Sequence, residues 1–159
     1  MIFTEASKDE AHEILALYRS LVGEEFCPWN EEYPSMREIG SDLARRSLFV
    51  MKEDGRIIAA ISLDDDEEVE ALPFWSRELV PGGELSRVAV SKDFQNRGIA
   101  RQLMRRAMDV MRSRGYKSMH FLVNKHNVKA LRSYAHLNAA VVGECFLFGQ
   151  PFFCCEIAL

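Results

Sequence analysis

The segment Gln95-Asn96-Arg97-Gly98-Ile99-Ala100 constrains the fold more than any other part of the sequence. A strand-like run at residues 84–90 (ELSRVAV) precedes it, and a helix-like run begins at Gly98. A strand that passes through a short glycine-containing loop into a helix leaves backbone N–H groups unpaired at the helix start. These donors and the positive end of the helix dipole favour an anion. The segment therefore predicts an anion-binding site at the start of a helix.

Charged residues are segregated along the chain, although the formal net charge is only −4. Residues 1–86 contain 8 basic and 20 acidic side chains, whereas residues 87–132 contain 12 basic and 2 acidic ones. Such segregation bears on binding partners rather than on the fold. We expect a polyanion beside the basic segment. The acidic run at residues 64–68 is either a solvated loop or a region that attracts a cationic substrate.

The composition, with 48% hydrophobic and 28% charged residues in a chain of 159, is that of a globular protein. We expect one domain over residues 1–159. No apolar run approaches the ~20 residues of a membrane span, and the start MIFTEASKDE does not resemble a signal peptide. A cytoplasmic protein without membrane attachment is expected. The cysteines lack metal-ligand spacing, so we expect buried reduced thiols and no metal site at Cys27, Cys145, Cys154 and Cys155.

Hydrophobic spacing and turn residues predict the order of secondary structure. Strands are expected at residues 2–5, 48–52, 56–63, 84–90, 118–123, 141–148 and 152–159, and helices at 11–23, 35–46, 98–114 and 127–137. Asp54-Gly55 predicts a hairpin between the second and third strands. Residues 149–151 are expected to form the turn of a closing hairpin between the last two strands. The order β-α-α-β-β-β-α-β-α-β-β predicts an α/β (α+β) fold with a mixed sheet, parallel in the middle and antiparallel at its flanks, with helices on both faces.

Residues 26–34 contain two prolines and two large aromatic side chains, Trp29 and Tyr33. They are too apolar for a solvated linker. The segment either closes over a site as a lid or covers the core.

A second motif, Asn127-x-x-Ala130-x-x-x-Tyr134, follows the Gln95 loop at the start of the next helix. ELSRVAV with Gln95-x-x-Gly98-x-Ala100, followed by this motif, resembles the acetyl-CoA site of the GNAT superfamily of N-acetyltransferases. The resemblance implies a GNAT-like mixed, mostly antiparallel sheet of about seven strands with helices on both faces. Members commonly carry Gly-Phe where this chain has Asn138-Ala139. Since Asn tolerates the left-handed conformation, we expect the helix end to be kept.

The resemblance also implies how acetyl-CoA, the expected co-substrate, is bound. Backbone N–H groups of the loop would bind the pyrophosphate, and Gly98 would let the backbone approach it without a Cβ. The preceding strand would contact the pantetheine arm and the acyl group through its main chain. Arg101 is expected to contact phosphate rather than to lie on a solvated helix face. The expected cofactor-binding residues are Val88, Ala89, Val90, Gln95, Asn96, Arg97, Gly98, Ile99, Ala100, Arg101, Asn127 and Ala130.

Two residues are predicted to be catalytic. By resemblance, Tyr134 would protonate the leaving thiolate as a general acid; otherwise it is a core aromatic. The attacking amine must be neutral, so a base is needed. Glu84 is our candidate, acting through water. Glu70 and the acidic run are less favoured alternatives. Otherwise Glu84 is an ordinary surface glutamate without a catalytic role. Direct transfer without a covalent enzyme intermediate is expected.

The predicted function is therefore transfer of an acetyl group from acetyl-CoA to a primary amine, either a small molecule or a peptide, by a monomer or homodimer. The alternative is a non-catalytic acyl-CoA-binding sensor or regulatory module of the same fold. Asn127 and Tyr134 favour the enzyme. Nucleic-acid binding is not expected, because the basic helix has no aromatic side chains on which bases could stack.

Overall fold

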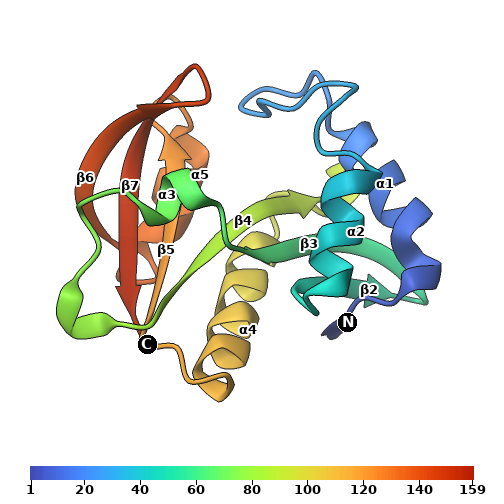
Figure 1. Cartoon of the computed structure of the whole chain (residues 1–159). Coiled ribbons are helices and arrows are strands. Elements are labelled where there is room, and N and C mark those ends of the chain that lie inside the picture. The colour runs from blue at the N-terminus through green and yellow to red at the C-terminus, as the bar shows by residue number, and fades with distance from the viewer. The chain divides into compact units, whose positions relative to one another are not determined.

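The computed structural model describes residues 1–159, and its main elements follow the predicted order (Figure 1). The strands are β1 (Ile2–Glu5), β2 (Leu48–Glu53), β3 (Arg56–Asp64), β4 (Gly82–Val90), β5 (Ser118–Asn124), β6 (Ala140–Leu147) and β7 (Gln150–Ala158). The α-helices are α1 (Ala11–Ser20), α2 (Met36–Ala44), α3 (Glu67–Glu70), α4 (Ile99–Ser113) and α5 (Val128–Ala135). Single 3₁₀ turns lie at Lys8–Glu10, Arg77–Leu79 and Lys92–Phe94.

The strands pair in the order β1-β2-β3-β4-β5-β7-β6. The pairs β1–β2, β2–β3, β5–β7 and β6–β7 are antiparallel, and β4–β5 is parallel. The predicted mixed, mostly antiparallel sheet with helices is thus confirmed. Its parallel pair is the one connected through α4, because parallel neighbours require a long crossover. The Asp54-Gly55 hairpin is also confirmed, with φ of 50° and 76° at these residues, as a type I′ turn requires.

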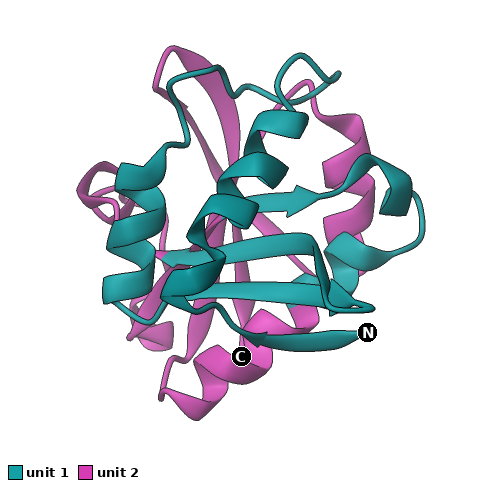
Figure 2. Ribbon diagram, turned by 90° about the vertical axis from the view of Figure 1, so that its right-hand side faces the viewer, with its two compact units in different colours: residues 1–63, 87–104 teal, residues 64–86, 105–159 magenta.

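The chain forms two compact units (Figure 2). Unit 1 contains residues 1–63 and 87–104, and unit 2 contains residues 64–86 and 105–159. Two of the boundaries fall inside β4, after Ser86, and inside α4, after Met104. A single domain over residues 1–159 stays a prediction. No helix combines the length and the apolar character needed to cross a bilayer.

In unit 1, α1 and α2 pack against the β2–β3 hairpin. Apolar residues of α1 recur every three or four positions, so they form one buried stripe. The buried cluster consists of Ala11, Ile14, Leu17, Tyr18, Leu21, Ile39, Leu48, Val50, Ile57, Ala60 and Ala89. Trp29 and Cys27 pack against it, with the Trp29 ring edge-on to Tyr18 at 5.1 Å. Part of the 26–34 segment therefore covers the core.

In unit 2, the two faces of the sheet carry different residues, because side chains alternate along a strand. Gly83 lies opposite Met119 in the β4–β5 register and faces α4, since a Cβ on Gly83 would collide with Met111. Glu84 lies opposite His120 and therefore faces the other way. His120 stacks on Trp75, with ring centroids 4.4 Å apart, so residues before β4 cover this second face.

Three local predictions need correction. The acidic run is more than a loop, because Asp66 caps the short helix α3 by accepting from the N–H groups of Glu68 and Val69 at 2.9 and 3.1 Å. Asp at an N-cap and Glu in the first turn favour such a helix. The last hairpin turns at residues 148–149, not 149–151, and Pro151 lies within β7. All four cysteines are free as expected, but only Cys154 and Cys155 are buried; Cys27 and Cys145 are half-buried.

The capping box at the start of α2 gives a stability prediction. Ser35 N–H donates to Glu38 Oε2 at 2.8 Å, and Ser35 Oγ accepts from the Arg37 N–H at 3.2 Å. Ser35→Ala is expected to lower the free energy of unfolding by about 1 kcal/mol, measured by urea denaturation. Ser41→Ala, an exposed position on the same helix, is the control and is expected to have little effect. Equal losses in both variants would contradict a specific role for the cap.

Candidate active site

Unit 1 builds the predicted anion loop between the end of β4 and the first turn of α4. The Gln95 side chain bridges the loop, since its Nε2 donates to the Val90 carbonyl oxygen at 3.1 Å. Asn96 and Gly98 have left-handed backbones, with φ of 63° and 76°. Gly and Asn are the residues that enter this region at the lowest cost. They turn the chain sharply so that α4 begins at Ile99.

The start of α4 presents donors without partners. The first intrahelical bond runs from the Gln102 N–H to the Gly98 carbonyl at 3.1 Å, so the N–H groups of Ile99, Ala100 and Arg101 have no acceptor within the helix. Gly98 is surrounded by open space, because a Cβ there would meet no heavy atom within 4 Å. The Arg101 Nε is buried and has no hydrogen-bond partner in the protein. A cationic donor and helix-start N–H groups in one turn suit a phosphate group.

Arg97 differs from Arg101. It is exposed, and its guanidinium carbon lies 5.1 Å from the centroid of the Phe94 ring. This cation–π contact holds the side chain beside the loop.

The strand that leads into the loop bends at Arg87, where φ is 47°. Beyond it, Ala89 is buried in the core of unit 1, whereas Val88 and Val90 are half-buried. Alternation along the strand directs these two side chains away from the core cluster that holds Ala89. The conformation at Arg87 therefore sets the direction of the main-chain groups at residues 88–90.

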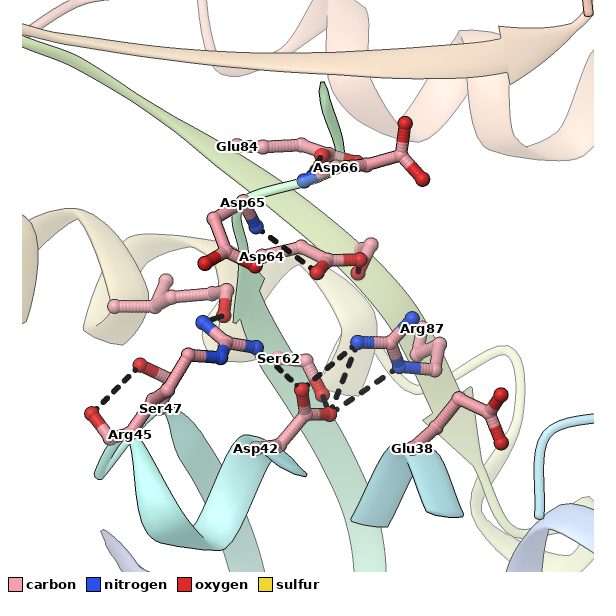
Figure 3. A network of polar contacts seen from close by, with 12 residues as sticks. Glu38, Asp42, Arg45, Ser47, Ser62, Asp64, Asp65, Asp66, Glu84 and Arg87 are labelled. Atoms are coloured by element: carbon pink, nitrogen blue, oxygen red, sulfur yellow. Dashed lines mark hydrogen bonds and ion pairs between the residues drawn. The ribbon is translucent and has the colours of Figure 1, made fainter. Parts of the chain in front are cut away.

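A buried ion pair, which was not predicted from the sequence, lies at this bend. Figure 3 shows Arg87 and Asp42 facing each other, with Nη2 of Arg87 2.9 Å and 3.0 Å from the two carboxylate oxygens. The Asp42 carboxylate also accepts from Ser62 Oγ at 2.7 Å and from Arg45 Nη2 at 2.6 Å. Burial raises the pKa of Asp42 while the Arg87 charge opposes the rise. No local pattern indicates this pair, because Asp42 and Arg87 are far apart in the chain.

In unit 2, the second motif forms the start of α5. Asn127 is the N-cap, and its Oδ1 accepts from the Ala130 N–H at 3.0 Å. Tyr134 is partly buried and packs edge-on against Phe121 with centroids 5.1 Å apart. Burial raises the pKa of Tyr134 to about 12. The hydroxyl therefore stays protonated at neutral pH and is available as a hydrogen-bond donor.

Glu84 is buried rather than on the surface, so the plain reading of a surface glutamate is wrong; only 5% of the residue is exposed. Its carboxylate accepts from the Asp66 N–H at 3.3 Å. Glu84 shares the face of His120, whereas Phe121, the neighbour of Tyr134, points to the other face. The two predicted catalytic residues consequently lie on opposite faces of the sheet in unit 2.

A buried histidine beside Glu84 was not predicted as part of the site. His120 Nε2 lies 2.7 Å from Glu70 Oε1, while Nδ1 is buried without a partner. Glu156 is opposite His120 in the β5–β7 register and binds the Ser76 N–H and Oγ at 2.9 and 2.6 Å. Burial lowers the pKa of His120, and the two glutamates oppose this shift. The strand SMHFLVN contains no signal for this cluster beyond a polar residue in an apolar run.

The predicted site residues are thus divided between the units. Unit 1 contains residues 88–90 and 95–101, and unit 2 contains Glu84, Asn127, Ala130 and Tyr134. Within unit 1 the structure brings the strand end, the loop and the helix start together. Within unit 2, Glu84 and Tyr134 lie on opposite faces of the sheet.

Comparison with known proteins identifies the family. The family model described as Acetyltransferase (GNAT) family matches residues 14–139. No curated protein matches the chain in sequence.

Many solved structures share the fold. A ribosomal-protein-alanine N-acetyltransferase from Brucella melitensis is 18% identical, with 100% of both chains covered and a TM-score of 0.76. A putative acetyltransferase from Salmonella typhimurium, with its cofactor acetyl-CoA, is 20% identical, with coverage of 100% and 94% and a TM-score of 0.78. The ribosomal-protein-S18-alanine N-acetyltransferase from Escherichia coli is 15% identical, with coverage of 99% and 92% and a TM-score of 0.75. At these identities the likeness concerns the fold.

The buried Nε of Arg101 predicts the effect of removing it. Arg101→Gln should weaken CoA binding about ten- to a hundred-fold, since a hydrogen bond to a charged group contributes ~1.5–3 kcal/mol. Isothermal titration calorimetry with CoA measures the change. Arg106→Gln removes an exposed arginine from the same helix and controls for net charge. If both variants lose the same affinity, long-range charge accounts for binding and the specific contact does not.

His120 gives a pH prediction. Its pKa is lowered in the folded protein, so below the ordinary value of about 6.5 the unfolded chain binds a proton that the folded chain resists. Stability is therefore lost as the pH falls from about 6.5. His120→Gln retains an N–H donor for Glu70 and is expected to lose less stability than the wild type between pH 7.5 and 5.5. Urea unfolding at both pH values tests this, and an equal or larger loss in the variant would refute it.

Proposed function

Because the chain belongs to the GNAT family of acetyltransferases, we propose that it transfers the acetyl group of acetyl-CoA directly to a primary amine. The observation that carries the proposal is the loop of unit 1, in which left-handed Asn96 and Gly98 lead to the start of α4. Acetyl-CoA supplies an activated thioester on a carrier with a pyrophosphate. The residues at the helix start fit that anion, because they offer unpaired N–H groups, open space at Gly98 and an orphaned Arg101 Nε.

We assign the phosphate contacts to the loop and the first turn of α4. The N–H groups of Ile99, Ala100 and Arg101 point out of the helix start, where the dipole favours negative charge. Gln95 acts indirectly, because its side chain binds the Val90 carbonyl and holds the loop. Asn96 supplies the left-handed turn, and Arg97 adds positive charge from its position over Phe94.

We assign the acyl group to the main chain at residues 88–90. A backbone N–H directed at a thioester carbonyl stabilises the negative charge that develops on its oxygen during attack. The side chains of Val88 and Val90 are apolar and half-buried, and an apolar environment strengthens such a hydrogen bond. Ala89 anchors the segment in the core. Asn127 orders α5 as its cap, and Ala130 keeps the side chain small one turn later.

Tyr134 is the proposed general acid. As the amine nitrogen bonds to the carbonyl carbon, the C–S bond breaks and the thiolate needs a proton. The raised pKa of Tyr134, about 12, keeps its proton in place until the thiolate forms. Since this pKa exceeds that of an ordinary thiol, about 8.5, full proton transfer to a free thiolate is uphill, and the hydroxyl stabilises the leaving sulfur chiefly by donating a hydrogen bond as negative charge develops.

Glu84 is the proposed acceptor of the amine proton, acting through water. Its place on β4, four residues before Val88, supports the role, and its carboxylate is enclosed in the protein with 5% of the residue exposed. Glu70 is a weaker candidate, since its carboxylate is already bound to His120 Nε2 at 2.7 Å.

The acceptor is proposed to be a primary amine on a small molecule or a peptide, with the enzyme acting as a monomer or homodimer. Two of the similar structures carry the name of ribosomal-protein-alanine N-acetyltransferases. An amino group at the start of a protein chain therefore belongs in any screen, beside cationic small amines that would suit the acidic first half of the sequence.

The decisive experiment measures free thiol release from acetyl-CoA over a panel of polyamines, aminoglycosides and peptides. Release that depends on one class of amine supports the enzyme and identifies the acceptor. Tight CoA binding in calorimetry without release for any amine would favour the sensor or regulatory module instead.

Tyr134→Phe tests the acid. We expect kcat to fall roughly ten- to a thousand-fold, the usual contribution of a general acid, with CoA affinity nearly unchanged, because the ring still packs on Phe121. Thiol release and calorimetry provide the two readouts. Full activity with every acceptor would exclude this role for Tyr134.

A further inference from the structure

We propose that the buried ion pair between Asp42 and Arg87 is a positioning device that holds the backbone of β4 in the conformation needed for acyl transfer. The inference rests on the proposed function, which assigns residues 88–90 to the acyl group. Neither side chain is assigned a contact with substrate.

The pair is built as a fixed support. The side chains of Arg87 and Asp42 are 7% and 1% exposed. Two nitrogens of Arg87 reach the carboxylate, because Nε lies 3.3 Å from Oδ2 in addition to the two Nη2 contacts. Ser62 and Arg45 bind the same carboxylate from β3 and from the end of α2. The anchor for Arg87 therefore belongs to two elements of unit 1.

The backbone at Arg87 needs such a support. A φ of 47° is left-handed, and a residue with a Cβ and a long side chain adopts it only when its surroundings impose it. If the backbone relaxed to an ordinary strand conformation, the guanidinium would leave Asp42. The buried carboxylate would then keep only Arg45 of its two cations, which is unfavourable. The ion pair and the left-handed backbone therefore maintain each other.

The consequence reaches the proposed acyl site directly. Val88 follows Arg87, so rotation at Arg87 would redirect the main-chain groups of residues 88–90. The far end of this segment is already fixed, because Ser91 N–H donates to the Ile58 carbonyl at 2.8 Å and Gln95 holds the Val90 carbonyl. At the Arg87 end, the direction of the segment depends on the contact between the Arg87 side chain and Asp42. A misplacement of about 1 Å in an active site can lower the rate ~10²-fold.

Asp42→Asn is the first test, since it keeps the shape of the side chain and removes its charge. We expect kcat to fall roughly ten- to a hundred-fold while the Kd for CoA changes by less than about threefold. Arg45→Gln is the matched control, because it breaks the other ion pair of the same carboxylate, 2.6 Å long, without touching β4. A similar fall in kcat for both variants, or a parallel weakening of CoA binding, would overturn the proposal.

Arg87→Gly and Arg87→Ala separate backbone conformation from side-chain loss. Both remove the ion pair, but only glycine adopts a positive φ without strain. If the pair serves to hold the backbone, Arg87→Gly should retain several-fold more kcat than Arg87→Ala, in the range that left-handed strain of about 1–2 kcal/mol allows. Equal losses in the two variants would mean that the side chain matters for another reason and would overturn the proposal.

Hydrogen exchange provides a readout that does not require activity. Peptides covering residues 87–91 should exchange faster in Asp42→Asn than in Arg45→Gln and the wild type, with unfolding by urea showing that each variant is folded. Unchanged exchange in a folded Asp42→Asn would overturn the positioning role. If Asp42→Asn does not fold, the comparison of Arg87→Gly with Arg87→Ala tests the positioning role instead. A wild-type protein that releases no thiol with any amine would refute the proposed function alone, while the exchange result still decides the role of the pair.

Discussion

The backbone of β4 is the constraint on which the rest of the structure depends. At its start the strand pairs in parallel with β5 through Gly82, Gly83 and Glu84, and near its end Ala89 is buried in the core of unit 1. Between these two regions Arg87 has a left-handed conformation, which an ordinary strand does not allow. The Arg87 guanidinium, which is held by Asp42, supports the bend between the parallel ladder and the core contact. Local strain is thus balanced by a buried ion pair, which is how strained backbone persists at functional sites.

Burial affects the neutral hydroxyl of Tyr134 and the permanent cation of Arg101 in different ways. For Tyr134, burial disfavours the phenolate and raises the pKa to about 12, so the hydroxyl is kept in the form that donates. For Arg101, the charge cannot be removed, and its buried Nε has no partner in the protein. A buried donor without an acceptor is unfavourable, and an anion at the start of α4 would relieve it. Burial therefore keeps Tyr134 of α5 protonated, and it makes binding of an anion at the start of α4 more favourable.

Features that depend on neighbours in sequence were predictable, and features that depend on tertiary contacts were not. The strand–loop–helix, the Asp54-Gly55 hairpin and the Ser35 cap follow from local backbone preferences, and the structure contains all three. Asn138 is left-handed, with φ of 60°, as was expected because family members commonly have glycine at this position. The burial of Glu84, the environment of His120 and the Asp42–Arg87 pair result from strand register and from packing between distant segments. Within ELSRVAV, arginine reads as an ordinary strand residue, so nothing local indicated the bend.

The positions of Glu84 and Tyr134 bear on how the proposed reaction divides its proton transfers. A direct transfer removes one proton from the amine and delivers one to the thiolate. A single group could do both only by changing its protonation state between the two steps. In unit 2 the strand alternation directs Glu84 and the ring that packs on Tyr134 to opposite faces of the sheet. Two different groups would then carry the two proton transfers, and burial keeps the proton on Tyr134 by raising its pKa to about 12. Because the two residues lie on opposite faces, the proposed reaction gives the amine proton and the thiolate proton to separate groups, and Glu84 reaches the amine only through water.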